Sequence, residues 1–127
     1  MIWQFPLWWF SVPALLKGWV DKVFAMGKFY DNGRIYENGL LKGKKALLSI
    51  TTGGPEKNYV TTKYGSTDQI LHPIQTGILE FVGFSVLPSE IHFSIERIGH
   101  EERKEILQRW SNRLKDIFTE PVITTYK

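Results

Sequence analysis

The sequence opens with an apolar run, MIWQFPLWWF, that a proline divides from a cluster of aromatic residues. An apolar run of this kind, followed by a helix signal, is typical of a buried β-strand. The strand would end near Pro6 and place Trp8, Trp9 and Phe10 at its carboxyl end. Open α/β sheets bind their ligands at the carboxyl ends of the strands, so we expect a ligand site at this cluster.

A helix is expected directly after the cluster, because residues 11–24 carry apolar side chains at a spacing close to 3.6. Ser11 is the expected N-cap, and Pro13 falls in the first turn, where its missing N–H is tolerated. The positive end of the helix dipole would then point at the aromatic cluster and favour a polar or anionic group. Residues 27–43 contain two Asn-Gly pairs, which predict a hairpin or an irregular excursion.

A second buried strand is predicted over residues 44–50, and it runs directly into the sequence Thr-Thr-Gly-Gly-Pro. Glycines in such a position let a planar or anionic ligand approach the main chain closely. A plain turn after a strand explains the same residues about equally well. The pattern alone therefore leaves both interpretations open.

The second half of the chain predicts a helix, a strand and a further helix. Residues 67–82 have helical periodicity, with Thr67 as N-cap and Pro73 near the first turns or at a kink. Residues 86–96 end in an alternation that predicts a half-buried strand at a sheet edge. A last helix is expected over residues 100–118. Its buried stripe would consist of Ile106, Leu107, Trp110, Leu114, Ile117 and Phe118, and its solvated face of Arg103, Lys104, Arg109, Arg113 and Lys115.

Strands that alternate with helices imply right-handed crossovers and a parallel sheet, so the fold class is α/β. The chain has one domain's length, and 43% hydrophobic residues provide ample material for a core. The net charge of +3 comes from scattered basic residues, which argues against nucleic-acid binding and permits a small anionic ligand. No stretch is typical of a targeting signal or a membrane span, and we expect a cytoplasmic location.

Catalytic signatures are scarce. The chain has no cysteine, its three histidines lie on different predicted elements without ligand spacing, and we expect no metal site. It also lacks a nucleophile elbow, a Walker loop and a GxGxxG motif. If the protein is an enzyme, a cofactor must carry the difficult chemistry while the protein orients it.

Four separated segments are similar to one known family. QFPLWWFSVPALLKGWVDKVF, KKALLSITTGG, ILHPIQTGILEFVGF and a helix ending in RW resemble the flavodoxin-like NAD(P)H:quinone oxidoreductases, the DT-diaphorase family of FAD-dependent dimers. The resemblance covers nearly the whole chain and implies a flavodoxin-like parallel sheet with flanking helices and strand order 2-1-3-4-5. The family's first strand, phosphate loop, first helix and second strand all precede the residue that matches Ile2. Residues 1–127 are therefore expected to form a single, incomplete flavodoxin-like domain.

The resemblance also assigns roles to residues. Cofactor contacts are implied for Pro6, Leu7, Trp8, Trp9, Phe10, Thr51, Thr52, Gly53, Gly54, Tyr59 and Arg103. Arg103 would reach the adenine-dinucleotide end of FAD, and Tyr59 would contact the flavin ring. Tyr64 stands where the best-known member has a histidine that is thought to assist charge relay, so Tyr59 and Tyr64 are the candidate catalytic residues. Tyr30, Asn32 and Phe81 would line the quinone pocket from the facing subunit of a homodimer.

Two functions follow from these expectations. The first is a flavin-dependent reductase, with FAD favoured over FMN, that passes hydride from NADH or NADPH to the flavin N5 and then to a quinone. The second is a catalytically inactive fragment that keeps only the dimerisation surface. Without a phosphate loop, we expect the chain alone to bind FAD weakly or not at all.

Overall fold

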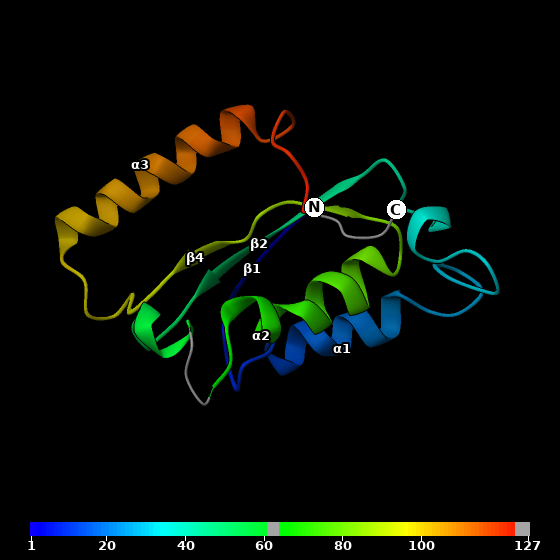
Figure 1. Cartoon of the computed structure of the whole chain (residues 1–127), viewed down its shortest axis with the longest axis horizontal. Helices are drawn as coiled ribbons and strands as arrows, with labels where there is room; N and C mark the ends of the chain where they lie inside the picture. The colour runs from blue at the N-terminus through cyan, green and yellow to red at the C-terminus, as the bar shows by residue number, and fades with distance from the viewer. Residues whose placement is uncertain (61–63, 124–127) are drawn as a thin grey trace.

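The computed structural model describes residues 1–60 and 64–123 of the 127-residue chain. Four strands and three α-helices alternate along it, with two short 3-10 helices and one π-helix between them (Figure 1). In chain order these are β1 (Ile2–Pro6), α1 (Ala14–Val23), η1 (Tyr36–Asn38), β2 (Lys45–Thr51), η2 (Glu56–Asn58), α2 (Thr67–Ile74), η3 (Gln75–Glu80), β3 (Ser85–Val86), β4 (Glu90–His92) and α3 (His100–Asp116).

The sheet is built on β2, with which β1, β3 and β4 all pair in parallel. Ile2 pairs with Leu47 at one end of β1, and Pro6 pairs with Thr51 at the other. The parallel sheet that the sequence predicts is thus confirmed. The single strand expected over residues 86–96 is wrong in extent, because the chain pairs only as β3 and β4, with Pro88 between them. Proline has no N–H to donate to a ladder, which accounts for a break at this point.

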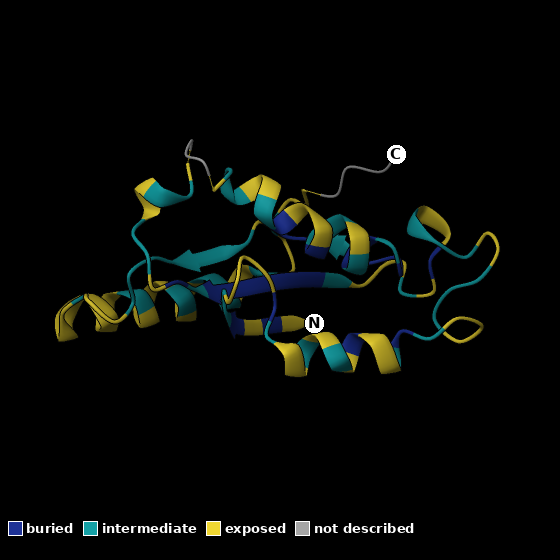
Figure 2. Ribbon diagram, turned by 90° about the horizontal axis from the view of Figure 1, so that it is seen from below, coloured by how far each residue is buried: buried dark blue, intermediate teal, exposed yellow. Residues whose placement is uncertain are grey.

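Helices cover both faces of the sheet. α1 and α2 lie on one face and α3 lies on the other (Figures 1 and 2). The buried core lies between the sheet and the α1/α2 layer. It contains Trp3, Phe5, Val12, Val20, Phe24, Ala46, Leu48, Ile50, Leu71, Ile74, Leu79, Val82, Phe84 and Val86. The apolar runs that predict buried strands at β1 and β2 therefore do form the core of the sheet.

The two expected N-caps of the helices are wrong. Pro13 holds the N-cap position of α1, whereas Ser11 uses its backbone to close the turn that precedes the helix. In α2 the N-cap is Ser66, whose hydroxyl accepts from the Gln69 N–H while the Gln69 side chain accepts from the Ser66 N–H. This reciprocal pair is a capping box, which satisfies two backbone donors at once. The hydroxyl of Thr67 instead donates to the Tyr59 carbonyl oxygen, at 3.2 Å.

The helix expected over residues 67–82 changes type part of the way along. The α-helical part ends at Ile74, and residues Gln75–Glu80 form a π-helix. Pro73 lies just before this change and cannot donate to the helical ladder, so the register of hydrogen bonds is already interrupted there. π-helical turns are frequent at functional sites.

The excursion between α1 and β2 is irregular, which is the second of the two expected forms. It contains an isolated bridge between Met26 and Tyr30 and the short helix η1. Its return path is fixed on η3 and the turn after it, because the Tyr36 N–H donates to the Phe81 carbonyl and the Leu41 N–H to the Val82 carbonyl. The excursion is thereby attached to the end of the second helical layer.

The buried stripe expected on α3 is wrong, because none of the residues of this helix is fully buried. Leu107 is 65% exposed, and Phe118, just beyond the helix, is 84% exposed. Cavities of about 230 and 290 Å³ separate this helix and its C-terminal extension from the sheet. The periodicity is that of a helix with a sheet beneath it, but in the described residues the sheet ends at β1 and leaves the stripe partly uncovered.

The solvated position expected for Arg113 is also wrong. Its guanidinium donates to Glu90 at 2.6 Å, to both carboxylate oxygens of Glu120 at 2.8 Å, and to the Pro88 carbonyl at 2.6 Å. Lys45 supports the same region by donating to the Phe118 and Glu120 carbonyls, each at 2.8 Å. These contacts attach the C-terminal end of α3 to β2 and β4.

This cluster predicts acid sensitivity. Hydrogen bonds from Arg113 hold the pKa of the Glu120 carboxyl below its ordinary value, so the ionised form stabilises the fold. The contribution is present above the unfolded-state pKa, about 4.3, and is lost as the pH falls through the lower folded-state pKa. We expect the free energy of unfolding in urea to fall below about pH 4. A Glu120→Gln variant should show a smaller fall over the same interval, and equal pH profiles for the two proteins would contradict this prediction.

Candidate functional site

The aromatic cluster after β1 forms a tight turn. The Trp8 N–H donates to the Ser11 carbonyl at 3.2 Å, and the Ser11 N–H donates back to the Trp8 carbonyl at 3.0 Å. The two central residues, Trp9 and Phe10, have φ angles of 52° and 58°. Left-handed backbone costs an ordinary residue about 1–2 kcal/mol, and such outliers are concentrated at functional sites.

The aromatic side chains of this turn project into solvent. Trp9 is 95% exposed, Trp8 is 60% exposed and Phe10 is 43% exposed. Three neighbouring aromatic side chains on a strained turn add little to the core. They do provide flat apolar faces on which a planar ring can stack.

The Thr-Thr-Gly-Gly segment lies beside this turn, at the carboxyl end of β2. The Leu7 N–H donates to the Thr51 carbonyl at 2.8 Å, so the start of the aromatic segment is fixed to the end of β2. Thr52 is buried, and its hydroxyl donates to the Gly54 carbonyl at 2.8 Å. A side chain at Gly53 would point into open space, whereas a Cβ at Gly54 would lie 3.2 Å from the Tyr59 hydroxyl oxygen. A flat ligand can therefore approach the main chain at Gly53.

The two candidate catalytic tyrosines lie against the aromatic turn. Tyr64 stacks on Phe10, with ring centroids 5.5 Å apart and an interplanar angle of 26°. Tyr59 lies 6.3 Å from Phe10 and 5.5 Å from Phe93, which follows β4. The cluster thus brings together residues that follow β1, β2 and β4, as the carboxyl ends of parallel strands should. The sequence prediction missed Phe93, although its place directly after an expected strand was a usable signal.

Arg103 lies on the other face of the sheet. It is on α3, and its guanidinium donates to the Ile95 carbonyl at 3.2 Å. Together with Thr51 and His92 it lines a cavity of about 230 Å³ between α3 and the sheet. Thr51 connects this cavity to the Gly-Gly edge, so Arg103 is near the site without contacting the aromatic turn.

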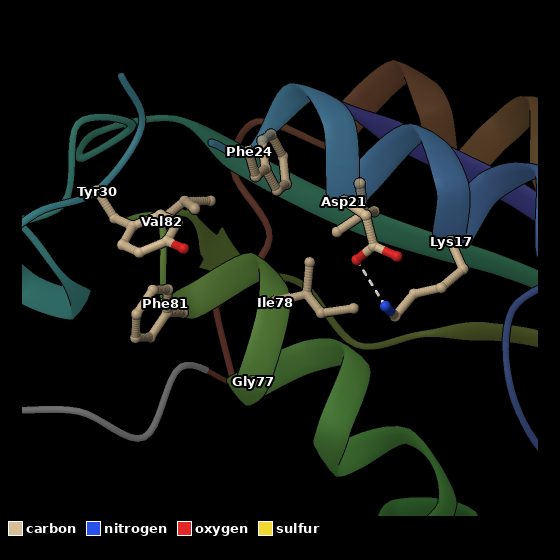
Figure 3. Close-up of a pocket in the computed structure, with 9 residues that line it drawn as sticks. Lys17, Asp21, Phe24, Tyr30, Gly77, Ile78, Phe81 and Val82 are labelled. Carbon is tan, nitrogen blue, oxygen red and sulfur yellow. Dashed lines mark hydrogen bonds and ion pairs between the residues drawn. The ribbon is translucent and has the colours of Figure 1, made fainter. Parts of the chain in front are cut away.

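The three residues expected to line a quinone pocket lie at the other end of α1. Tyr30 and Phe81 are in edge-to-face contact, with centroids 5.2 Å apart, and both line a cavity of about 300 Å³ between α1 and η3 (Figure 3). Lys17 and Asp21 form a 2.6 Å ion pair at its rim, which no sequence pattern indicates. Asn32 does not line this cavity.

Within one chain the two groups of residues are well separated. α1 begins beside the aromatic turn, and its ten residues span about 15 Å before the excursion that carries Tyr30. The structure therefore brings together the expected flavin-ring contacts, and separately Tyr30 with Phe81, without joining the two sets. This separation agrees with the expectation that the quinone residues come from a facing subunit.

Two further searches concern only residues 1–60 and 64–123. No group of three His, Asp or Glu side chains is arranged there to hold a metal ion. None of the helices in that part of the chain has the length and apolar content needed to cross a bilayer.

A parallel sheet with helices on both faces and a ligand site at the carboxyl ends of its strands defines an open α/β protein of the nucleotide-binding type. A family described as having a flavodoxin-like fold matches residues 1–117. The chain belongs to this family.

Several known proteins are similar to the chain. Human ribosyldihydronicotinamide dehydrogenase (quinone) is 48% identical over 124 residues, which are 97% of this chain and 54% of the human protein. NAD(P)H dehydrogenase (quinone) 1 of Cavia porcellus is 46% identical over 94% of this chain and 44% of its own length. The crystal structure of a candidate quinone reductase from Klebsiella pneumoniae superposes with a TM-score of 0.90 at 35% identity, over 99% of this chain and 52% of that protein. The chain thus spans about half the length of the relatives it matches.

Proposed function

We propose that this chain supplies the flavin-ring site of an NAD(P)H:quinone oxidoreductase. The observation that carries the proposal is the strained turn with Trp9 and Phe10, which exposes aromatic faces beside the open main chain of Gly53. Similarity to dehydrogenases named for quinones supports a quinone as electron acceptor and a reduced nicotinamide as donor. The flavin would supply the hydride chemistry, and this chain would bind and orient it.

Each part of the site has a task in this proposal. Trp9 and Phe10 would stack on one face of the ring and exclude water from it. The backbone at Gly53 and Gly54 would hydrogen-bond the polar edge of the pyrimidine. The hydroxyl of Tyr59, beside Gly54, would hold a proton near that edge, with Tyr64 against Phe10 as the second phenol.

The remaining assignments extend beyond one chain. FAD is favoured over FMN, although one related structure, general stress protein 14 from Treponema denticola, is a complex with FMN and is 26% identical. Arg103 would neutralise the adenine-dinucleotide end of FAD. Tyr30, Asn32 and Phe81 of a second copy would close the quinone pocket in a homodimer. The inactive-fragment alternative stays in contention because the aromatic turn and the Gly-Gly edge account for contacts to the ring only.

The site predicts a particular order of flavin affinities. Because the described contacts address the ring, riboflavin, FMN and FAD should all bind the 127-residue chain weakly, at tens of micromolar or above, with affinities within about tenfold (1.4 kcal/mol) of one another. Quenching of flavin fluorescence during titration measures this. Sub-micromolar FAD binding would contradict the prediction and favour a complete cofactor site.

A pair of variants tests the position of the site. Trp9→Asn keeps a residue that tolerates left-handed backbone but removes the indole, and should weaken flavin binding at least fivefold. Leu15→Asn is the matched control, since Leu15 is 90% exposed on α1 and lies outside the turn. Both proteins should unfold at the same urea concentration as the parent. Equal flavin affinity in the Trp9 variant would overturn the proposed site.

A further inference from the structure

The outer edge of β1 is open in the described residues, where β1 pairs only with β2. The Leu47 N–H donates to the Met1 carbonyl, and the Leu7 N–H donates to the Thr51 carbonyl. Odd-numbered residues therefore turn their backbone groups toward β2. Since alternate residues of a parallel strand bond to opposite neighbours, the N–H and C=O groups of Ile2 and Gln4 point to the open edge.

Apolar surface borders this edge on both faces of the sheet. On the α1 side a groove of about 470 Å³ runs along the strand and includes Trp3, Leu15 and Trp19 in its lining. On the α3 side a cavity of about 290 Å³ lies between Ile2 and the C-terminal region that contains Phe118. Leu15, at 90% exposed, and Phe118, at 84% exposed, are among the most exposed apolar side chains of the molecule. Exposed apolar surface around an unpaired strand is a pairing site that proteins normally cover.

The geometry of the edge restricts what can cover it. A helix packed on one face would leave the other apolar surface and the free backbone groups uncovered. A β-strand supplies the missing hydrogen bonds, and its side chains alternate between the two faces, so that it fills both cavities. Strands buried on both faces are characteristic of parallel sheets, and every pairing in this sheet is parallel.

The length of the relatives identifies the occupant. The chain matches 54% of the human protein and 52% of the Klebsiella protein, so each carries a comparable length of chain outside the match. We propose that the β1 edge accepts a parallel strand from that unmatched part of a flavodoxin-like chain, and that a separate polypeptide can supply it. The docking is independent of flavin and of the proposed chemistry.

Fragment complementation tests this inference. The probe is the segment of human ribosyldihydronicotinamide dehydrogenase (quinone) that precedes its match to Ile2, added as a separate polypeptide without flavin. Amide hydrogen exchange should slow at least tenfold at Ile2 and Gln4. Trp3 and Phe5, whose backbone groups already face β2, should change much less.

A variant pair locates the contact. Ile2→Lys places a charge on the edge, which disfavours strand pairing, and should weaken binding of the probe at least tenfold. Val60→Lys is the control, because Val60 is similarly exposed and lies in the loop after η2. Absence of protection with the probe, equal protection at Trp3 and Phe5, or equal binding by the two variants would each overturn the proposal. Protection of Ile2 and Gln4 that rises with the concentration of the chain alone would replace it with pairing between two copies.

Discussion

Replacing Gly83 with alanine is expected to lower the free energy of unfolding by about 3 kcal/mol, since two separate costs add at this position. Gly83 has a φ of 104°, which L-residues rarely adopt, and a Cβ there would lie 2.8 Å from the backbone of Gly39. This is where the excursion packs against the turn after η3. Neither backbone segment can shift easily, because the adjacent Leu41 N–H and Val82 carbonyl are hydrogen-bonded across the contact.

Two other glycines separate the costs. Gly43 has a φ of 81° with open space where a methyl group would lie, so Gly43→Ala should cost only the backbone strain, about 1–2 kcal/mol. Gly39 has a φ of −62°, but its Cβ would lie 2.5 Å from Gly83, so Gly39→Ala reports the contact alone. Urea unfolding of the three variants measures the set. A Gly83 variant no less stable than the Gly43 variant would show that the backbone contact yields without cost.

Replacing Arg113 with alanine should produce the second large loss, about 2–3 kcal/mol of unfolding free energy. The change leaves the carboxylates of Glu90 and Glu120 without their guanidinium partner while both side chains stay mostly covered. It also removes a donor from the Pro88 carbonyl, beside the break between β3 and β4.

The control for Arg113 is an arginine on the same helix. Arg109 is exposed, and Arg109→Ala should change stability by no more than about 0.5 kcal/mol. The pH dependence provides a second readout. The Arg113 variant should lose part of the stability difference between pH 7 and pH 3, since Glu120 no longer has a lowered pKa in the folded state. An unchanged pH profile would show that the cluster contributes little.

The sequence predicts the strands and helices that rest on long apolar patterns, and these are the elements that form the core. Its errors have a common cause, which is that periodicity identifies an apolar face without showing what covers it. Leu107 and Phe118 have the spacing of a buried stripe, yet they remain exposed. Arg113 lies in a row of basic residues that is otherwise solvated, and its partners Glu90 and Glu120 belong to segments that only the fold brings near.

The candidate site shows the same division between what local sequence determines and what it does not. The aromatic cluster at the end of β1 and the Gly-Gly edge at the end of β2 are predictable, because topology fixes where parallel strands end. The left-handed backbone of Trp9 and Phe10 is not, since nothing in an aromatic residue favours a positive φ. The assignments of Arg103, Asn32 and the tyrosines to cofactor or substrate remain predictions.

The dependence of the whole sheet on β2 has a consequence for how the chain folds. β1, β3 and β4 form no ladder with one another among the described residues, so each pairing must wait for β2. The paired residues, such as Ile2 with Leu47 and Ile50 with Ile91, are distant in the sequence, which makes the contact order high and folding slow. Until both crossovers close, Leu47, Leu48 and Ile50 are exposed to solvent together, and intermolecular association during refolding should begin at this strand.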